Sequence, residues 1–457
     1  MSRTFLKVAA LRYLFNSWII LLPAIIYSTS AIAVPSFGRQ TGMACSAFHT
    51  VFPELTAFGR QFKLRGYTLE SQSVNQEFPY NLPLTVGLQS GITSISDPNK
   101  GATPSLDFPR ADKAIVQQVA FYYAGKISDN LGAWIQYNWD GIAQQWGAEM
   151  ADIRYANSLS AGSRDLLFGV SLANSPTVQD VWATSSMWGF PHLNDAGIMP
   201  MYRSLLDMTL DNQVGAVSIY TQYDGQYYGE IGLLRNGNTG IFHPLNVGDP
   251  LNVAIAGSAP KLRLAWEKNT ENSSYELGMH ALRADIFPDP QNQSGPTDRY
   301  TDLALDGQYQ YLGQTNIVTF HAFIDHEKRN WNGSYAEGMA SNLSDNLNTF
   351  RTDINYWFKH MLGGGIGYFK YSGSNDPMKY SMGTGMPSAT TNITGSPDTQ
   401  GWITEIDYLP LRDRQNLKLG LRYTIFTKFN GETENYNGFG RNASDNNSIF
   451  AYLWLLY

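Results

Sequence analysis

LKLGLRYTI, residues 417–425, alternates apolar and polar side chains without a break and is the clearest indication of how this chain folds. In an extended chain, Leu417, Leu419 and Leu421 lie on one face, whereas Lys418 and Arg422 lie on the other. An apolar face opposite a charged face is typical of a transmembrane β-strand, which contacts lipid on one side and a polar lumen on the other.

The same alternation recurs in segments of roughly ten residues from about Pro79 onward, for example at 133–140 and 261–267. It assigns a set of charged residues to the inward face of these strands: Asp152, Arg154, Lys261, Arg263, Glu267, Glu276, His280, Lys418 and Arg422. We interpret them mainly as a polar lumen wall, and the alternative is a role in guiding ions or docking the N-terminal segment.

Short turns and long loops alternate along the chain. Gly, Asn and Asp mark turns at 128–130, 161–163, 224–225, 270–272, 313–314, 362–364 and 412–414. Longer polar segments lie near 96–112, 141–147, 175–212, 236–258, 287–298, 327–346, 373–399 and 428–447. Seven hairpins, with a first strand at 84–95 and a last at 448–457, predict an all-β, sixteen-stranded antiparallel transmembrane barrel of porin type.

The barrel prediction also places the protein in the cell. Short turns face the periplasm in outer-membrane barrels, so an even strand number predicts periplasmic N- and C-termini. The terminal aromatic Tyr457 resembles the last-strand signal of outer-membrane proteins. A soluble all-β protein is the alternative, although its outer faces would carry more charge.

Composition limits the possible partners. Residues 1–33 have the cationic start, apolar centre and small-residue end of a secretory signal. Removing its three cations changes the formal charge from -7 to -10, and no basic run remains, so nucleic acid is not expected as a partner. We expect three parts: the signal at 1–33, an N-terminal segment at 34–78 and the outer-membrane barrel at 79–457.

The N-terminal segment carries one unusual motif, MACSAFHTVFPELTAFGRQFKLRGYT, residues 43–68. Cys45, the sole cysteine, and His49 have the spacing of C-x-x-C-H, in which two cysteines attach haem and the histidine ligates its iron. Phe48 stands at the second cysteine position. Nearby, Arg60, Lys63 and Arg65 could pair with haem propionates or form a solvated basic face.

VPSFGRQTGMAC and HTVFPELTAFGRQFKLRGYT, which span 34–45 and 49–68, resemble the N-terminal module of the fused monohaem cytochrome c–porin family. Known members of that family are outer-membrane cytochromes that oxidise extracellular ferrous iron. The resemblance implies haem c held through a single thioether to Cys45, with His49 as the ligand of the haem iron. It also implies outer-membrane lipid, ferrous iron and a periplasmic cytochrome or copper protein as partners.

Two functions therefore follow from the sequence. In the first, the chain carries electrons from an extracellular donor such as ferrous iron through a haem to periplasmic carriers. In the second, it is a passive outer-membrane porin with a degenerate, haem-free N-terminal segment. Motifs of hydrolases, metalloproteases and nucleotide-binding enzymes are absent from the sequence, so we name no catalytic residue and expect redox activity only with haem.

Overall fold

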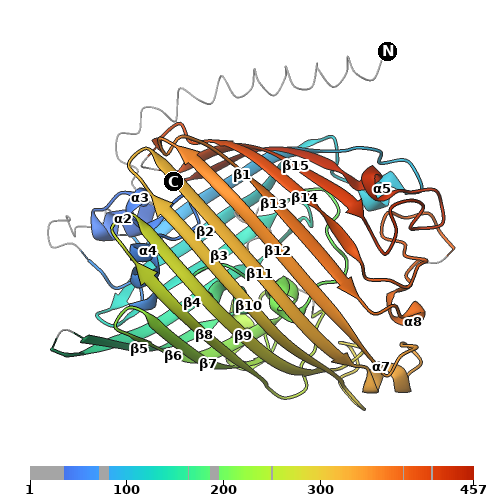
Figure 1. Ribbon diagram of the computed structural model, residues 1–457, viewed down its shortest axis with the longest axis horizontal. Helices are drawn as coiled ribbons and strands as arrows, with labels where there is room; N and C mark the ends of the chain where they lie inside the picture. The colour runs from blue at the N-terminus through green and yellow to red at the C-terminus, as the bar shows by residue number, and fades with distance from the viewer. Residues whose placement is uncertain are drawn as a thin grey trace.

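Sixteen antiparallel strands close into a barrel in the computed structural model, which describes residues 35–70, 82–162, 164–185, 195–248, 251–383, 385–412 and 415–457. Each strand pairs with its neighbours in sequence, and β1 pairs with β16 to close the sheet (Figure 1). The strands are β1 (Leu84–Ile95), β2 (Ala114–Ser128), β3 (Leu131–Asp140), β4 (Gln145–Ala161), β5 (Arg164–Ala173), β6 (Val214–Tyr223), β7 (Tyr227–Asn236), β8 (Ala259–Asn269), β9 (Ser273–Ile286), β10 (Asp298–Leu312), β11 (Asn316–Asn330), β12 (Ser344–Phe358), β13 (Leu362–Gly373), β14 (Thr399–Tyr408), β15 (Leu417–Lys428) and β16 (Ser448–Leu456). The sixteen-stranded, porin-like barrel predicted from the sequence is confirmed.

One predicted turn is wrong. Leu362–Gly364 belongs to β13, and the chain instead turns at 359–361, where Lys359 and His360 both have φ 54. The glycines have a packing role, because a Cβ at Gly363 would lie 2.2 Å from the ring of Trp357 on β12. The strand β4 also begins at Gln145, inside the predicted 141–147 loop. The predicted signal at 1–33 and the turn residues 163 and 413–414 lie outside the described residues.

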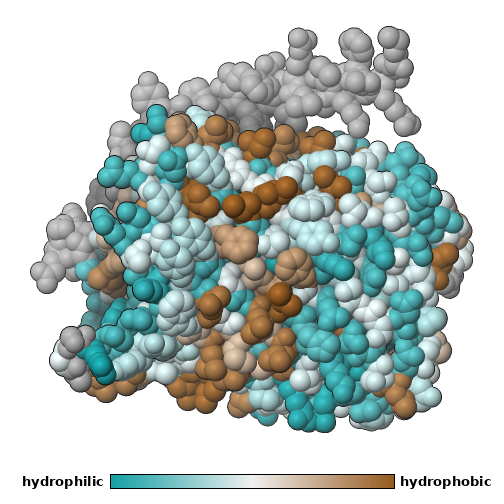
Figure 2. Space-filling model, in the orientation of Figure 1, coloured by the Kyte–Doolittle hydropathy of each residue, from teal (hydrophilic) through white to brown (hydrophobic). Residues whose placement is uncertain are grey.

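Side chains alternate across the wall as the sequence predicts. Leu421 is 48% exposed on the outer surface, whereas Lys418 and Arg422 are buried on the inner one. All the charged residues assigned to the inward face are buried. In Figure 2, apolar side chains form a band across the middle of the visible wall, and hydrophilic side chains lie toward both ends. Among the described helices, none is both long and apolar enough to cross a membrane.

Short helices lie at both ends of the barrel. The N-terminal ones, α2 (Pro35–Thr41), α3 (Cys45–Phe48) and α4 (Ala57–Leu64), lie at the end with the short turns (Figure 1, blue). The loops carry α5 (Pro104–Asp107), α6 (Pro176–Gln179), η2 (Leu205–Thr209), η3 (Gly240–Leu245), α7 (Asn332–Ala336), α8 (Pro377–Tyr380) and η5 (Ala443–Asn446). Buried Phe37, Phe48 and Phe62 pack against Tyr122 and Trp454 of the inner wall, so the N-terminal helices occupy the lumen.

The loop between β5 and β6 also enters the lumen. The Trp182 Nε1 donates to Glu267 on β8 at 3.1 Å, and the Thr184 hydroxyl donates to Asp306 on β10 at 2.6 Å. Further along the loop, the backbone N–H of Leu205 donates to Glu327 on β11 at 2.8 Å. Two segments far apart in sequence, 35–70 and the described parts of 174–213, therefore share the interior with the inward side chains of the wall.

Candidate functional site in the barrel lumen

The haem-like motif forms one helical turn that is fixed on α4. His49 donates its backbone N–H to the Cys45 carbonyl at 2.9 Å, which closes α3. Thr56 caps α4 by accepting from the Gly59 N–H at 3.1 Å and donates its hydroxyl to the Ala47 carbonyl at 2.7 Å. A Cβ at Gly59 would lie 2.1 Å from the Phe48 carbonyl oxygen, so only glycine permits this contact. Cys45, Phe48 and His49 are thus held by contacts within the segment.

Arg60 fastens this segment to the barrel. Its side chain is 0% exposed, and its guanidinium donates to the Glu267 carboxylate at 2.8 Å across the lumen. It also donates to Ser274 at 2.6 Å, Gln308 at 3.0 Å, Gln310 at 2.8 Å and the Leu55 carbonyl at 2.9 Å. The expectation of a solvated residue is therefore wrong for Arg60, because its side chain is buried and its donors are satisfied within the barrel.

The other two cations of the segment face the wall as well. Lys63 donates to the Val178 carbonyl and lies 3.6 Å from the Asp152 carboxylate, and burial lowers the pKa of Lys63 to about 8. Arg65 pairs with Asp165 at 2.6 Å at the rim, where both side chains are about a third to a half exposed. The Tyr67 hydroxyl also donates to Asp152, at 2.5 Å.

His49 is oriented by a backbone carbonyl. Its Nδ1 lies 3.2 Å from the Pro53 carbonyl oxygen, so the ring donates from Nδ1 when it is neutral. Burial, opposed only in part by backbone contacts to Pro53 and Glu54, lowers the pKa of His49 to about 4. The imidazole is therefore neutral at pH 7. A neutral ring with Nδ1 held by a carbonyl is the arrangement in which metal-bound histidines are usually found.

His49 borders an aromatic cavity. This cavity has a volume of about 170 Å³. Its walls combine residues of the N-terminal segment with the barrel: Phe48, Phe52, Phe62, Tyr122, Trp134, Met150 and Trp454 are among them. We call it the aromatic cavity. Cys45 is 3% exposed and is not among its lining residues, whereas Phe48 is.

The residues fit haem in one respect and not in another. A neutral, carbonyl-anchored imidazole beside an apolar, aromatic cavity suits ligation of haem iron. Attachment through Cys45 is less well served, because its side chain is buried and is not among the residues that line the cavity. Within the described residues, no three His, Cys, Asp or Glu side chains are arranged to hold a metal ion directly.

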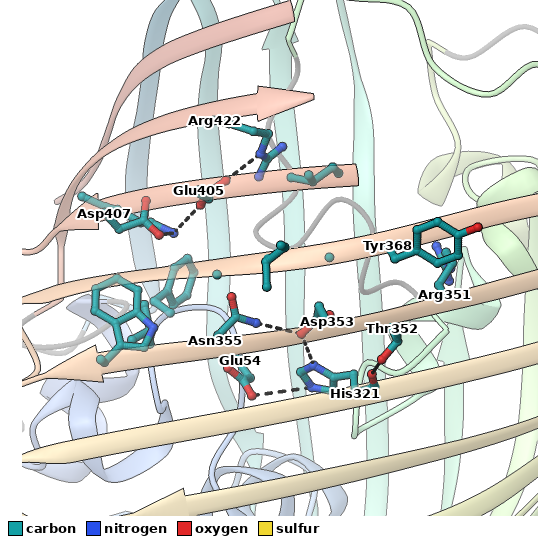
Figure 3. A pocket seen from close by; sticks show the side chains of 18 residues that line it. Glu54, His321, Arg351, Thr352, Asp353, Asn355, Tyr368, Glu405, Asp407 and Arg422 are labelled. Carbon is teal, nitrogen blue, oxygen red and sulfur yellow. Dashed lines mark hydrogen bonds and ion pairs between the residues drawn. The ribbon is translucent and has the colours of Figure 1, made fainter. Parts of the chain in front are cut away.

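A second cavity lies on the other side of the Val51–Glu54 turn, against β11–β15 (Figure 3). We call it the ionic cavity, because His321, Asp353, Glu405, Lys418 and Arg422 line it together with Glu54. It has a volume of about 80 Å³, partly because the inward positions 365 and 367 of β13 are glycines. Phe52 borders both cavities.

Charges in the ionic cavity are paired with one another. Glu405 accepts from Arg422 at 2.6 Å and from Lys418 at 3.2 Å, and Lys418 lies 3.0 Å from Asp407. His321 lies 3.0 Å from Asp353 and 3.6 Å from Glu54 of the N-terminal segment. The prediction that Lys418 and Arg422 face the lumen is confirmed, and the structure adds the carboxylates that they contact.

Sequence reasoning missed several residues of this site. Met150 contributes a thioether to the aromatic cavity from β4, and Gln415 accepts from the Phe52 N–H at 2.8 Å and so holds the turn between the cavities. Alternation places Met150 on the inward face with Asp152 and Arg154, so its orientation was available from the pattern. Nothing in the sequence pairs Gln415 with Phe52, 363 residues away.

Comparisons with known proteins find outer-membrane proteins among the solved structures, at low sequence identity. No protein-family model and no curated protein matches the chain. An anion-selective porin from Comamonas acidovorans is 11% identical, with a TM-score of 0.42, over 82% of this chain and 98% of that one. The outer-membrane channel DcaP of Acinetobacter baumannii is 12% identical, with a TM-score of 0.43, over 82% and 96%. OmpT, an outer-membrane protein of Vibrio cholerae, is 10% identical, with a TM-score of 0.40, over 82% and 96%.

Proposed function

We propose that this protein is an outer-membrane channel protein of porin type whose lumen is partitioned by its own N-terminal segment. The observation that carries the proposal is the closed sixteen-stranded wall, apolar outside and charged inside. A closed barrel leaves no unpaired strand edge, and a wall of this size is wide enough to hold segments inside it. The N-terminal segment and the β5–β6 loop narrow the passage, so solutes would pass beside the paired charges of the ionic cavity.

The test is to fold the mature chain into planar bilayers and to measure conductance, after showing outer-membrane fractionation and a heat-dependent shift in gel mobility. We expect small, steady conductance steps. Extraction into aqueous buffer without detergent would contradict the membrane assignment. Leu421→Arg should impair assembly, because a cation near the bilayer midplane costs about 2–4 kcal/mol. Thr424→Arg, on the inner face of the same strand, is the matched control for an added cation.

A second candidate function is electron transfer through a haem held at His49. The observation that favours it is the neutral imidazole, with Nδ1 at 3.2 Å from the Pro53 carbonyl, on the wall of the aromatic cavity. A bound haem would supply a one-electron centre. His49 would hold its iron, Met150 offers a thioether from the barrel wall, and the aromatic side chains would exclude water. Electrons from an extracellular donor such as ferrous iron would then reach a periplasmic carrier.

Covalent haem content tests this candidate. A haem stain of the denatured wild-type chain, expressed in a host competent for cytochrome maturation, should be weak with Cys45 as the single attachment residue. Phe48→Cys should strengthen it, because the second thioether position is restored. His49→Ala in the Phe48→Cys background should remove normal ligation. Absence of stain in wild type with a gain in Phe48→Cys would favour the haem-free porin, and a colourless Phe48→Cys protein would reject the haem site.

A further inference from the structure

The outer surface of the barrel carries a groove at the end of the wall nearest the long loops. It spans β6–β10 and has a volume of about 710 Å³. The outward side chains Val217, Ile219, Ile231 and Leu262 give it apolar walls. Its depth comes from Pro260 and Ala281, because these are shorter than the outward residues beside them. The groove therefore suits a hydrocarbon chain lying against the wall.

Two cations lie at the loop end of this groove in one lateral row. Thr301 on β10 is in register with Arg283 on β9 and with Lys328 on β11, and all three side chains are exposed. Neighbouring strands lie about 4.8 Å apart, so the Arg283 and Lys328 backbones are separated by roughly 10 Å. Both flexible side chains can reach a single ligand placed over Thr301.

These two cations differ from the other outward arginines nearby. Arg299 pairs with Asp285 at 2.7 Å, and Arg235 donates to Ser258 at 2.9 Å. Within the described part of the chain, no ion pair or hydrogen bond joins the side chain of Arg283 or Lys328 to another residue, and the nearby outward carboxylate that Arg283 acts on, Asp285, is already paired with Arg299. Each cation is therefore available to an anion from outside the chain.

The position of Arg283 along β9 indicates which class of anion can reach it. The outward residues of β9 run Tyr275, Leu277, Met279, Ala281 and then Arg283, so Arg283 is the first cation after the apolar part. Ten residues of a tilted strand separate Arg283 from the turn end of β9. This length corresponds to roughly 25 Å along the barrel axis, which is close to the height of the apolar band of an outer-membrane barrel. A cation at this height faces lipid headgroups.

We propose that Arg283 and Lys328 bind the phosphate of a phosphorylated, acylated lipid of the leaflet at the loop end, with one acyl chain in the groove over Ala281. Two basic side chains that converge on one phosphate, with a hydroxyl between them, provide charge-assisted hydrogen bonds, and the groove supplies apolar contact. This inference rests on the proposed function, because it requires the barrel to lie in a membrane with its loops at the outer leaflet.

Native mass spectrometry can count the lipids that stay on the barrel. The full mature chain is folded into phosphatidylcholine bilayers doped with diphosphoryl lipid A, or in a second arm with dephosphorylated lipid A, and is then released. We expect one diphosphoryl lipid A per barrel and little of the dephosphorylated form. Arg283→Gln with Lys328→Gln should reduce the retained fraction roughly tenfold through the lost charge-assisted contacts.

Two further variants separate the parts of the site. Ala281→Phe should also reduce retention, because it fills the groove while leaving both cations in place. Lys268→Gln, which removes an exposed outward cation at the turn end of β8, is the control and should retain lipid A fully. The phosphate site would be overturned if the double variant retained as much diphosphoryl lipid A as wild type. It would also be overturned if wild type retained the dephosphorylated lipid as well as the diphosphoryl one. Full retention in Ala281→Phe would overturn the groove. A chain that never enters the bilayer would refute the proposed function, whereas a heat-modifiable barrel that releases its lipid would refute this site alone.

Discussion

The two lumenal cavities share Phe52 as a lining residue but differ in how their polar side chains are paired. In the ionic cavity, carboxylates and cations contact one another, as in Glu405 with Arg422 at 2.6 Å. In the aromatic cavity, the one imidazole is neutral and is held through Nδ1, and none of the charged lining residues Lys63, Glu149 and Asp180 forms an ion pair with it among the described residues. The ionic cavity is therefore suited to set an electrostatic field for passing ions. The aromatic cavity is suited to hold an apolar or metal-bearing ligand.

The largest effect is expected from removing the contact that holds the N-terminal segment on the barrel wall. Arg60→Met should detach the 45–67 region from the wall, because it leaves Glu267 buried without this cation and removes the hydrogen bonds to β9 and β10. Breaking one side of a buried ion pair costs about 3–5 kcal/mol. Conductance should rise and the two cavities should merge, and limited proteolysis from the turn end should cut within the segment.

Arg65→Gln is the matched control. It also removes a cation that pairs with the wall, but Arg65 and Asp165 are 44% and 34% exposed. Such a pair contributes about 0–1 kcal/mol, so conductance and cleavage should stay near the wild-type values. Conductance near the wild-type value in both variants would show that neither arginine holds the partition.

Acid should destabilise the N-terminal segment at the aromatic cavity. The pKa of His49 is about 4 in the folded protein, against an ordinary value of 6.5. The unfolded segment thus takes up this proton first as pH falls, so stability from the neutral ring is present above pH 6.5 and is lost between pH 6.5 and 4. The loss reaches about 3 kcal/mol at most. Hydrogen exchange of 45–67 should accelerate over this range in wild type, and the acceleration should be absent in His49→Gln.

A smaller effect is expected from changing one charge in the ionic cavity. Glu405→Gln keeps the side-chain volume but removes the carboxylate that faces Arg422 and Lys418. Losing hydrogen bonds to a charged group costs about 2 kcal/mol, and the excess positive charge should favour anions. The reversal potential in a salt gradient should shift toward anion selectivity. Asp129→Asn, in a turn where the carboxylate is 94% exposed, should leave the potential unchanged.

The barrel was more predictable from the sequence than the lumen. A strand has period two, so Leu421 and Arg422 reveal which face each occupies without any knowledge of their neighbours. Turn signals located six of the seven short connections, and failed where Gly363 makes room for Trp357. Local patterns carry this information because strands adjacent in the barrel are adjacent in sequence.

Contacts of the N-terminal segment could not be predicted in the same way. Arg60 pairs with Glu267 across 207 residues, and no sequence period links them. The motif around Cys45 and His49 indicated haem as the ligand. It did not indicate that Phe48 and Met150 would line the same cavity. The haem ligands Cys45 and His49 stay predictions, which the stain of the Phe48→Cys protein tests.

The smallest expected effect concerns Phe52, which separates the cavities directly. Its ring centroid lies 4.5 Å from that of Trp454 and 4.9 Å from that of His49, so Phe52→Leu keeps an apolar side chain but loses both ring contacts. Aromatic pairs contribute about 0.5–1.5 kcal/mol beyond burial, and hence the unfolding free energy should fall by about 1 kcal/mol. A cycle with Trp454→Leu isolates the pair, because the double variant should lose less than the sum of the single losses. Phe450→Leu, in the same cluster on β16, is the control, and its loss should add to that of Phe52→Leu. Strict additivity of Phe52→Leu with Trp454→Leu would mean that the partition depends on the Gln415 contact to the Phe52 backbone rather than on the ring.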